Sequence, residues 1–195
     1  RRGGFAQAVA GAIAITADAL RSEWTDPKAY PAVFAPPYAA DGVFRDSGEA
    51  TRELLRVAGQ IYEGVGKLYL TPALGEAADS AKPKRAVFWR SGQTFAFLDA
   101  QLAAAEALFG DDGLGPALTE GDGAAGRNAL SFETAQTRRA IAAGSEDVLA
   151  AFADAEIHGR LSFARTPAGG AAAVINPRIA NALGLIVGFN SLDGD

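Results

Sequence analysis

Apolar residues in this chain recur at spacings of three and four, and this spacing strongly limits how the chain can fold. The first such stripe consists of Phe5, Val9, Ile13, Thr16, Leu20 and Trp24. Similar stripes cover residues 54–68 and 95–109. An α-helix turns once every 3.6 residues, so positions spaced in this way lie on one side of a helix. The pattern therefore predicts helices over most of the chain.

Residues that start or stop helices set the expected boundaries in the first half of the chain. Asp26-Pro27 should end the first helix, and Thr71-Pro72 should end the second. Asp46 with Glu49 three residues later is typical of a helix start. Ser91 is the predicted N-cap of the third helix. The only candidate strand is the short run Ala86–Trp89.

The second half of the chain has weaker stripes. We expect a fourth helix over residues 127–142, and its stripe consists of Leu130, Phe132, Ala135 and Ile141. A fifth should begin at Gly144-Ser145 and break at the segment "TPAGG", residues 166–170. A last short helix should cover Pro177 to Leu185. These elements predict an all-α, up-and-down bundle of about four main helices with long loops. Residues 1–195 are expected to form a single domain.

Composition and charge exclude several classes of function. The net charge is −5 and no run of Lys or Arg occurs, which argues against binding nucleic acid or an anionic membrane surface. The chain has no cysteine, so it cannot form a disulfide or a zinc–thiolate site. The apolar stretch Ala6 to Leu20 contains Gln7, Thr16 and Asp18 and is too short to span a bilayer. We therefore expect no transmembrane span.

Familiar catalytic and phosphate-binding motifs are absent from the sequence. His158 is the only histidine, whereas a zinc protease needs two histidines one helical turn apart and a glutamate base. We interpret His158 as an ordinary structural or surface residue. The glycine-rich segments "EGVGKLY" and "EGDGAAGR" do not follow a strand and lack the spacing of a Walker motif. No residue is therefore predicted to be catalytic.

The segment "FWRSGQT", residues 88–94, is one candidate for a binding site. Arg90 is a fixed cation in a loop that leads into a predicted helix N-terminus, where free N–H groups favour anions. The alternative is structural, with Ser91 only capping the helix and Trp89 only covering the end of the bundle. The residues themselves slightly favour the structural interpretation.

The final segment "GFNSLDGD" is the second candidate. Phe189 is expected to be buried, whereas Asn190, Asp193, Asp195 and the terminal carboxylate place several oxygen atoms in a short turn. Such oxygens suit a hard cation or can hold an arginine, and Arg90 is the expected partner. A clamp between Arg90 and Asp193 or Asp195 is the simpler hypothesis, and a metal site at these two carboxylates is the alternative.

Three segments resemble the imelysin-like family. The ending "LGLIVGFNSLDGD" is similar to the carboxyl-terminal signature of that family. The segment "WRSGQTFAFLDAQLAAAEALF" resembles a short Ser-Gly turn that starts a long helix in many bacterial members. The opening "RRGGFAQAVAGAIAITADALRSEW" resembles the helix with which the second half of the family fold begins.

The resemblance implies a bacterial periplasmic or outer-surface protein, often lipid-anchored, that takes part in iron acquisition. It also implies two helical bundles with a pocket between them, of which this chain supplies the carboxyl-terminal one. The expected partners are the missing amino-terminal half and other components of iron uptake. Iron or another metal ion would be bound mainly through the missing half.

Two features depart from the family pattern. The Gly-x-His-x-x-Glu motif behind the metallopeptidase label has no counterpart, because His158 is followed by Gly159, Arg160 and Leu161. Nothing in the chain resembles the first half of the family. Three hypotheses follow: a binding protein for metal uptake, a subunit of a metallopeptidase whose catalytic His and Glu lie in the missing half, and a purely structural helical domain. The binding protein is the leading hypothesis, because the chain offers fixed charges but no competent acid–base pair or nucleophile.

Overall fold

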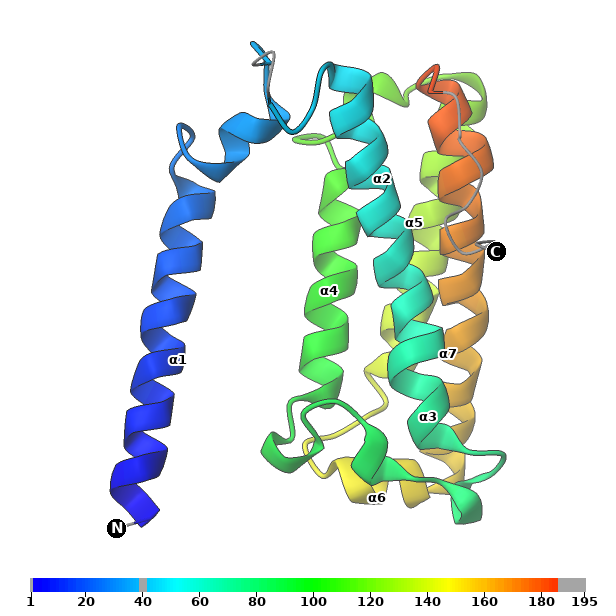
Figure 1. The fold of residues 1–195 in the computed structure, drawn as a ribbon. Coiled ribbons are helices and arrows are strands. Elements are labelled where there is room, and N and C mark those ends of the chain that lie inside the picture. The colour runs from blue at the N-terminus through cyan, green and yellow to red at the C-terminus, as the bar shows by residue number, and fades with distance from the viewer. Residues whose placement is uncertain (1, 39–41, 186–195) are drawn as a thin grey trace, which may run out of the picture. The chain divides into compact units, whose positions relative to one another are not determined.

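The computed structural model describes residues 2–38 and 42–185, and within these ranges every regular element is a helix (Figure 1). The predicted all-α class is therefore confirmed. The strand expected at Ala86–Trp89 is wrong, because this segment is a turn that leads into the short 3-10 helix Trp89–Ser91. The chain divides into two compact units, Arg1–Glu53 and Leu54–Asp195. The organisation of residues 1–195 as a single domain stays a prediction.

The first unit contains the long helix α1, Arg2–Thr25, and the 3-10 helix Tyr30–Phe34. Helix α1 ends just before Asp26-Pro27, as predicted. Its last aromatic residue, Trp24, packs edge-on against Tyr30 with ring centroids 4.6 Å apart and stacks on Phe34 at 6.3 Å. Phe34 in turn contacts Phe44 at 5.2 Å. This aromatic cluster holds the end of α1 against the following loop.

The apolar part of α1 is longer than the stretch Ala6 to Leu20. Among the described residues, Gly3–Thr25 is the one helix that is long and apolar enough to cross a membrane. The helix extends beyond residues 6–20 on both sides, through Gly3, Gly4 and Phe5 before them and residues 21–25 after them, so that stretch alone understates its length. Core helices of soluble proteins and signal sequences share this length and composition.

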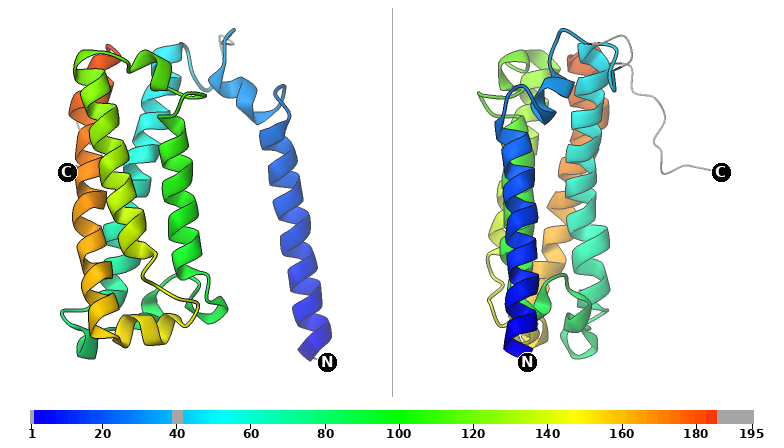
Figure 2. Two further views of the ribbon diagram at one scale, coloured as in Figure 1. Left: turned by 180° about the vertical axis from the view of Figure 1, so that it is seen from behind. Right: turned by 60° about the vertical axis from the view of Figure 1, so that its left-hand side comes forward.

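Four long helices form the bundle. They are α2 (Ser47–Gly64), α4 (Thr94–Leu108), α5 (Gly121–Ile141) and α7 (Ala155–Val174). Successive long helices run in opposite directions, and short helices α3 (Thr71–Leu74) and α6 (Val148–Ala153) lie at one end (Figure 1). Helix α5 packs along α7, as Figure 2 shows from behind. The predicted up-and-down bundle is confirmed.

The predicted starts of α2 and α4 had different outcomes. Asp46 Oδ1 accepts the N–H of Glu49 at 2.9 Å, which confirms the predicted start of α2. Ser91 is not the N-cap of α4, because the helix begins at Thr94 after Gln93. The Ser91 hydroxyl instead donates to the Phe88 carbonyl at 3.1 Å.

The second helix continues past its predicted end at Thr71-Pro72. After α2, a π-helical segment η2, Val65–Leu70, leads directly into α3. Pro72 lacks an N–H donor, and it directly follows the π-helical segment, where the α-helical hydrogen-bond pattern has already changed. The stop comes at Gly75, whose φ of 66° is left-handed, and a Cβ there would lie 2.6 Å from the Ser80 carbonyl oxygen. Only glycine fits this turn.

The apolar stripe predicted for the fourth helix is wrong in part. Helix α5 begins at Gly121, earlier than expected, and Phe132 is 61% exposed. The inward face consists of Gly123, Gly126, Leu130, Thr134, Thr137, Ala140 and Ile141. Glycine and threonine occupy most of these positions, so a search for large apolar residues misses the face that is buried.

The predicted break at residues 166–170 is also wrong. Helix α7 continues through Pro167 to Val174, and the π-helical segment η7, Ile175–Ala180, follows directly. Asp154 caps the start of α7 and Asp147 caps the start of α6, so Gly144-Ser145 is not a cap. Leu161, Ala164, Ala168 and Ala171 on α7 are fully buried. Packing of this face against α5 outweighs the local cost of proline and glycine in a helix.

Candidate functional site

The turn at Trp89–Ser91 belongs to the candidate segment 88–94 and lies between two left-handed residues, Phe88 with φ 56° and Gly92 with φ 70°. Trp89 is half-buried against the core, whereas Arg90 and Ser91 are exposed. The Arg90 guanidinium lies 4.4 Å from the centroid of the Trp89 ring, which is a cation–π contact. The turn therefore fixes the direction of the arginine.

The other predicted site residues, Phe189, Asn190, Asp193 and Asp195, lie outside the described residues. The clamp between Arg90 and this segment, and the metal site at Asp193 and Asp195, stay predictions. Within residues 2–38 and 42–185, no three His, Cys, Asp or Glu side chains gather closely enough to hold a metal ion.

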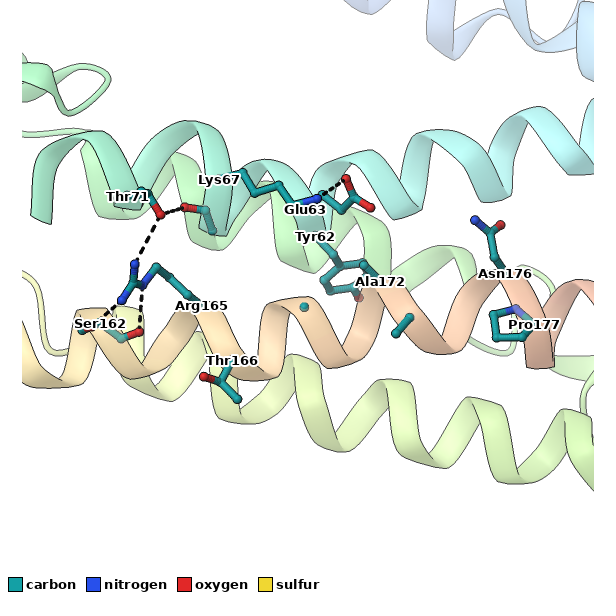
Figure 3. A pocket seen from close by; sticks show the side chains of 13 residues that line it. Tyr62, Glu63, Lys67, Thr71, Ser162, Arg165, Thr166, Ala172, Asn176 and Pro177 are labelled. Carbon is teal, nitrogen blue, oxygen red and sulfur yellow. Dashed lines mark hydrogen bonds and ion pairs between the residues drawn. The ribbon is translucent and has the colours of Figure 1, made fainter. Parts of the chain in front are cut away.

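A polar groove lies between two walls of the bundle (Figure 3). One wall is the end of α2 with η2 and α3, and the other wall is α7 with η7. The volume of the groove is about 580 Å³. Its lining residues are Tyr62, Glu63, Gly66, Lys67, Thr71, Ser162, Arg165, Thr166, Gly169, Ala172, Ala173, Asn176 and Pro177. Every one of these residues belongs to the second unit, so one compact body holds the whole groove.

Both walls of the groove contain a π-helical segment. Gly66 and Lys67 lie in η2, and Asn176 and Pro177 lie in η7. In η2 the N–H of Thr71 bonds to the Gly66 carbonyl, and the Thr71 hydroxyl donates to the same oxygen at 2.8 Å. π-Helical turns are rare, and they occur frequently at functional sites because they redirect side chains.

Arg165 spans the groove from α7 to the opposite wall. Its Nε donates to the Ser162 carbonyl at 3.2 Å, and its Nη2 donates to the Ser162 hydroxyl at 2.8 Å. Its Nη1 lies 3.5 Å from Thr71 Oγ1, a long contact that completes the link (Figure 3). All three partners are uncharged oxygens. The guanidinium is therefore held in place while its positive charge stays unpaired with any carboxylate of the described residues.

Lys67 is the second cation of the groove. Its Nζ lies 3.1 Å from Glu63 Oε2, one helical turn earlier on the same wall. The Lys67 side chain is 70% exposed and that of Glu63 is 33% exposed, so water screens this pair and its contribution to stability is small. The pair is therefore weak enough to rearrange.

Tyr62 lies beneath the groove and is fully buried. Its hydroxyl lies 2.7 Å from Thr134 Oγ1 of α5, and the threonine hydroxyl donates to the Leu130 carbonyl at 2.7 Å. The tyrosine is therefore the donor in the bond to Thr134. Burial raises the pKa of Tyr62 to about 12, so the phenol stays neutral at physiological pH.

His158 lies at the start of α7 and is only 7% exposed. Its Nε2 lies 3.0 Å from the Leu74 carbonyl oxygen, which can only accept, so Nε2 is the donor in this bond. The residue joins α7 to the end of α3, which agrees with the predicted structural role. It also lines an open hollow of about 640 Å³ that shares Arg165 and Ser162 with the groove.

Sequence reasoning did not identify the groove. The segment "EGVGKLY" is helical and so is not a phosphate loop, as predicted, yet Glu63, Gly66 and Lys67 line the groove. On α7, Ser162, Arg165, Thr166 and Gly169 recur at spacings of three and four. This polar stripe is a usable signal only when residues 155–174 are taken as one helix.

Comparison with known protein families finds a match. The family model for imelysin, which is classified as peptidase M75, matches residues 3–162. This range contains the α2–η2–α3 wall of the groove and Ser162, whereas Arg165 and the rest of α7 follow it. No curated protein and no solved structure matches the chain. The match covers well over half of the 195 residues, and the chain therefore belongs to the imelysin family.

Proposed function

We propose that this chain is the ligand-binding part of an imelysin-family protein that serves metal uptake, with iron as the expected metal, at the bacterial cell envelope. The observation that carries the proposal is the polar groove between the α2–η2–α3 wall and α7. Its volume of about 580 Å³ lies in the range of small-molecule sites. Lys67 and Arg165 line the groove from opposite walls, Lys67 paired with Glu63 and Arg165 bonded to Ser162 and Thr71 (Figure 3).

The proposal places the protein in the periplasm or on the outer surface, where a lipid anchor would hold it. This location rests on the family resemblance. Helix α1 gives it limited support, because Gly3–Thr25 is apolar and long enough to serve as an anchor or signal. The proposed partners are the amino-terminal half of the same protein and other components of iron uptake.

The experiment is an uptake measurement in the source organism. A strain that lacks the gene should accumulate less radioactive iron under iron limitation and should grow more slowly than the parent strain. Complementation with the intact gene should restore both. Unchanged iron uptake in the deletion strain, with a verified loss of the protein, would contradict the proposal.

A second candidate function is a subunit of a metallopeptidase. The observation that favours it is the classification of the matched family as a peptidase family. In this case the catalytic His and Glu would come from the missing half. Peptide cleavage by the whole protein that a chelator abolishes, together with normal iron uptake in the deletion strain, would favour this alternative.

A further inference from the structure

We propose that the groove is a site for a small organic carboxylate, and that Arg165 binds the carboxylate group. The inference deepens the proposed function, because it names the class of ligand, and it rests on the groove being a binding site. Three features carry it: the bonding of Arg165, the net charge of the groove and the length of the groove.

The bonding of Arg165 leaves capacity for an anion. A guanidinium has five N–H donors. Ser162 and Thr71 engage three of them, on Nε, Nη2 and Nη1. Two N–H donors remain, one on each terminal nitrogen, and this pair matches the two oxygens of a carboxylate. The bonds to Ser162 orient the side chain, which reduces the ordering that a ligand must supply.

The net charge of the groove selects the class of anion. The charged residues in its lining are Lys67, Arg165 and Glu63, and two cations with one carboxylate leave a net charge of +1. Since Glu63 pairs with Lys67, the uncompensated charge belongs to Arg165. One positive charge is balanced by a monocarboxylate. A dianionic phosphate ester would bring an excess negative charge close to Glu63.

The length of the groove leaves room for a ligand larger than a bare anion. The groove extends along α7 and η7 from Arg165 to Asn176 and Pro177 (Figure 3). Eleven residues of helix correspond to about 16 Å. Between these ends the wall is lined by Gly169, Ala172 and Ala173, which leave room for an apolar body. The fitting ligand therefore has one carboxylate and an extended apolar part.

The test uses three probes with the same alkyl chain and different head groups: hexanoate, hexanamide and hexyl phosphate. Binding to the full 195-residue chain is followed by two-dimensional amide NMR, which also locates the site. We expect shifts concentrated in residues 62–71 and 162–177. Hexanoate should bind about tenfold or more tightly than the neutral amide, because a charge-assisted bond to Arg165 distinguishes them. Hexyl phosphate should bind no more tightly than hexanoate.

Variants of the groove make the test specific. Arg165→Gln should reduce the preference for hexanoate over hexanamide to about one. Arg160→Gln is the matched control, since Arg160 is an exposed arginine on the same helix that pairs with Glu156 at 2.7 Å. It should leave the preference unchanged. Glu63→Gln releases Lys67 and raises the net charge of the groove to +2. This substitution should tighten the binding of hexanoate, and it should tighten the binding of hexyl phosphate more.

Several outcomes would overturn the inference. It fails if hexanoate and hexanamide bind equally, or if Arg165→Gln and Arg160→Gln have equal effects. It also fails if no probe shows saturable binding. Tighter binding of hexyl phosphate than of hexanoate to the unaltered chain would assign the groove to phosphate esters instead. A melting temperature for each variant confirms that it is folded, and Glu63→Gln tests the site without removing Arg165.

The inference and the proposed function fail in distinguishable ways. If the deletion strain loses iron uptake but hexanoate binds no more tightly than hexanamide, the proposed function stands and the carboxylate site falls. If hexanoate binds as expected but the deletion strain takes up iron normally, the site stands and the role in metal uptake falls.

Discussion

At the scale of single residues, the bond between Tyr62 and Thr134 shows why a polar residue occupies the buried face of α5. Both residues are fully buried and come from different helices. A buried hydroxyl without a partner lowers the stability of the fold by more free energy than a paired hydroxyl contributes. Each of the two residues therefore requires the other. The pair supports the floor of the groove, because Tyr62 also lines it.

The first prediction tests this pair by Thr134→Val. The substitution leaves the Tyr62 hydroxyl buried without an acceptor, and the free energy of unfolding should fall by about 1–3 kcal/mol. Thr137→Val is the matched control. Thr137 is equally buried on the same helix, but its hydroxyl only donates to the Glu133 carbonyl, so the change should cost much less. Urea unfolding measures both variants.

A double variant separates the pair from general packing effects. In the Thr134→Val background, Tyr62→Phe removes the unpaired hydroxyl and should recover part of the lost stability. If the two changes together cost the sum of the single changes, the bond does not have the role described here.

At the scale of elements, the bundle depends on close contact between helices and on ionic links across them. Small residues let α5 approach α7 and η7, since a Cβ on Gly126 would lie 3.1 Å from Ile179 Cγ1. On the other side of α5, Arg138 binds Asp99 of α4 through two bonds of 2.7 and 3.1 Å. Arg138 also contacts Glu106 at 3.2 Å. The two faces of α5 therefore use different physical means to hold their neighbours.

The second prediction compares two glycines. Gly126→Ala should destabilise the protein, because Ile179 must move to admit the new methyl group. Gly59→Ala is the control, since Gly59 lies inside α2 and a methyl group added there would meet no neighbouring atom within 4 Å. That change should stabilise the protein by about 0.5–1 kcal/mol through helix propensity. Equal stabilisation in thermal unfolding would contradict the close contact.

The third prediction concerns the pH dependence of the link between α4 and α5. The bonds from Arg138 hold the pKa of Asp99 below its ordinary value. A carboxylate with a lowered pKa stabilises the fold fully above its unfolded pKa of about 3.9, and this stabilisation is lost as the pH falls through the folded pKa. Asp99→Asn should therefore lower the unfolding free energy at neutral pH, and its difference from the unaltered chain should shrink below about pH 4.

Asp111→Asn serves as the control for this experiment. Asp111 is 91% exposed and makes one bond to Arg127, so its loss should change stability little. A difference between Asp99→Asn and the unaltered chain that stays constant between neutral and strongly acidic pH would show that the carboxylate charge is not the cause.

At the scale of the whole molecule, the hydrophobic core belongs to the second unit. The cluster of buried apolar residues extends from Leu55 to Ala180 and includes members from all four long helices. The first unit has its own aromatic contacts around Trp24 and Phe34. Each unit therefore has its own packing, and the groove depends on the second unit.

The fourth prediction follows from this division. A shortened chain of residues 45–195 keeps the cap of α2 and the whole core cluster, and it should fold and unfold cooperatively. Its melting temperature should lie within about 3 °C of that of the full chain, which corresponds to less than about 1 kcal/mol. The matching comparison is a chain shortened to residues 60–195, which loses most of α2 and should not fold. A shortened chain of residues 45–195 that lacks a cooperative transition would contradict the prediction.

The sequence by itself determined the class of fold and the long helices near the start of the chain. The apolar spacing over residues 5–24, 54–68 and 95–109 corresponds to α1, α2 with η2, and α4. Local signals sufficed there because the apolar spacing follows the helical period and short-range bonds, such as that of Asp46, set helix starts. The spacing gives the helix but not its burial, since the apolar stripe of α1 is exposed. The family was also identifiable, because two of the three segments that resemble it, residues 1–24 and 89–109, lie almost wholly within the matched range 3–162.

Only the tertiary structure decided the course of α7 and the location of the groove. Pro167 and the glycines after it locally favour a break, but packing of Ala164, Ala168 and Ala171 in the core keeps the helix continuous. The groove joins Thr71 to Arg165, which are 94 positions apart. No local pattern relates two such residues, since their contact exists only after the helices have packed against each other. The chemistry of the groove is therefore a property of helix packing rather than of any one segment.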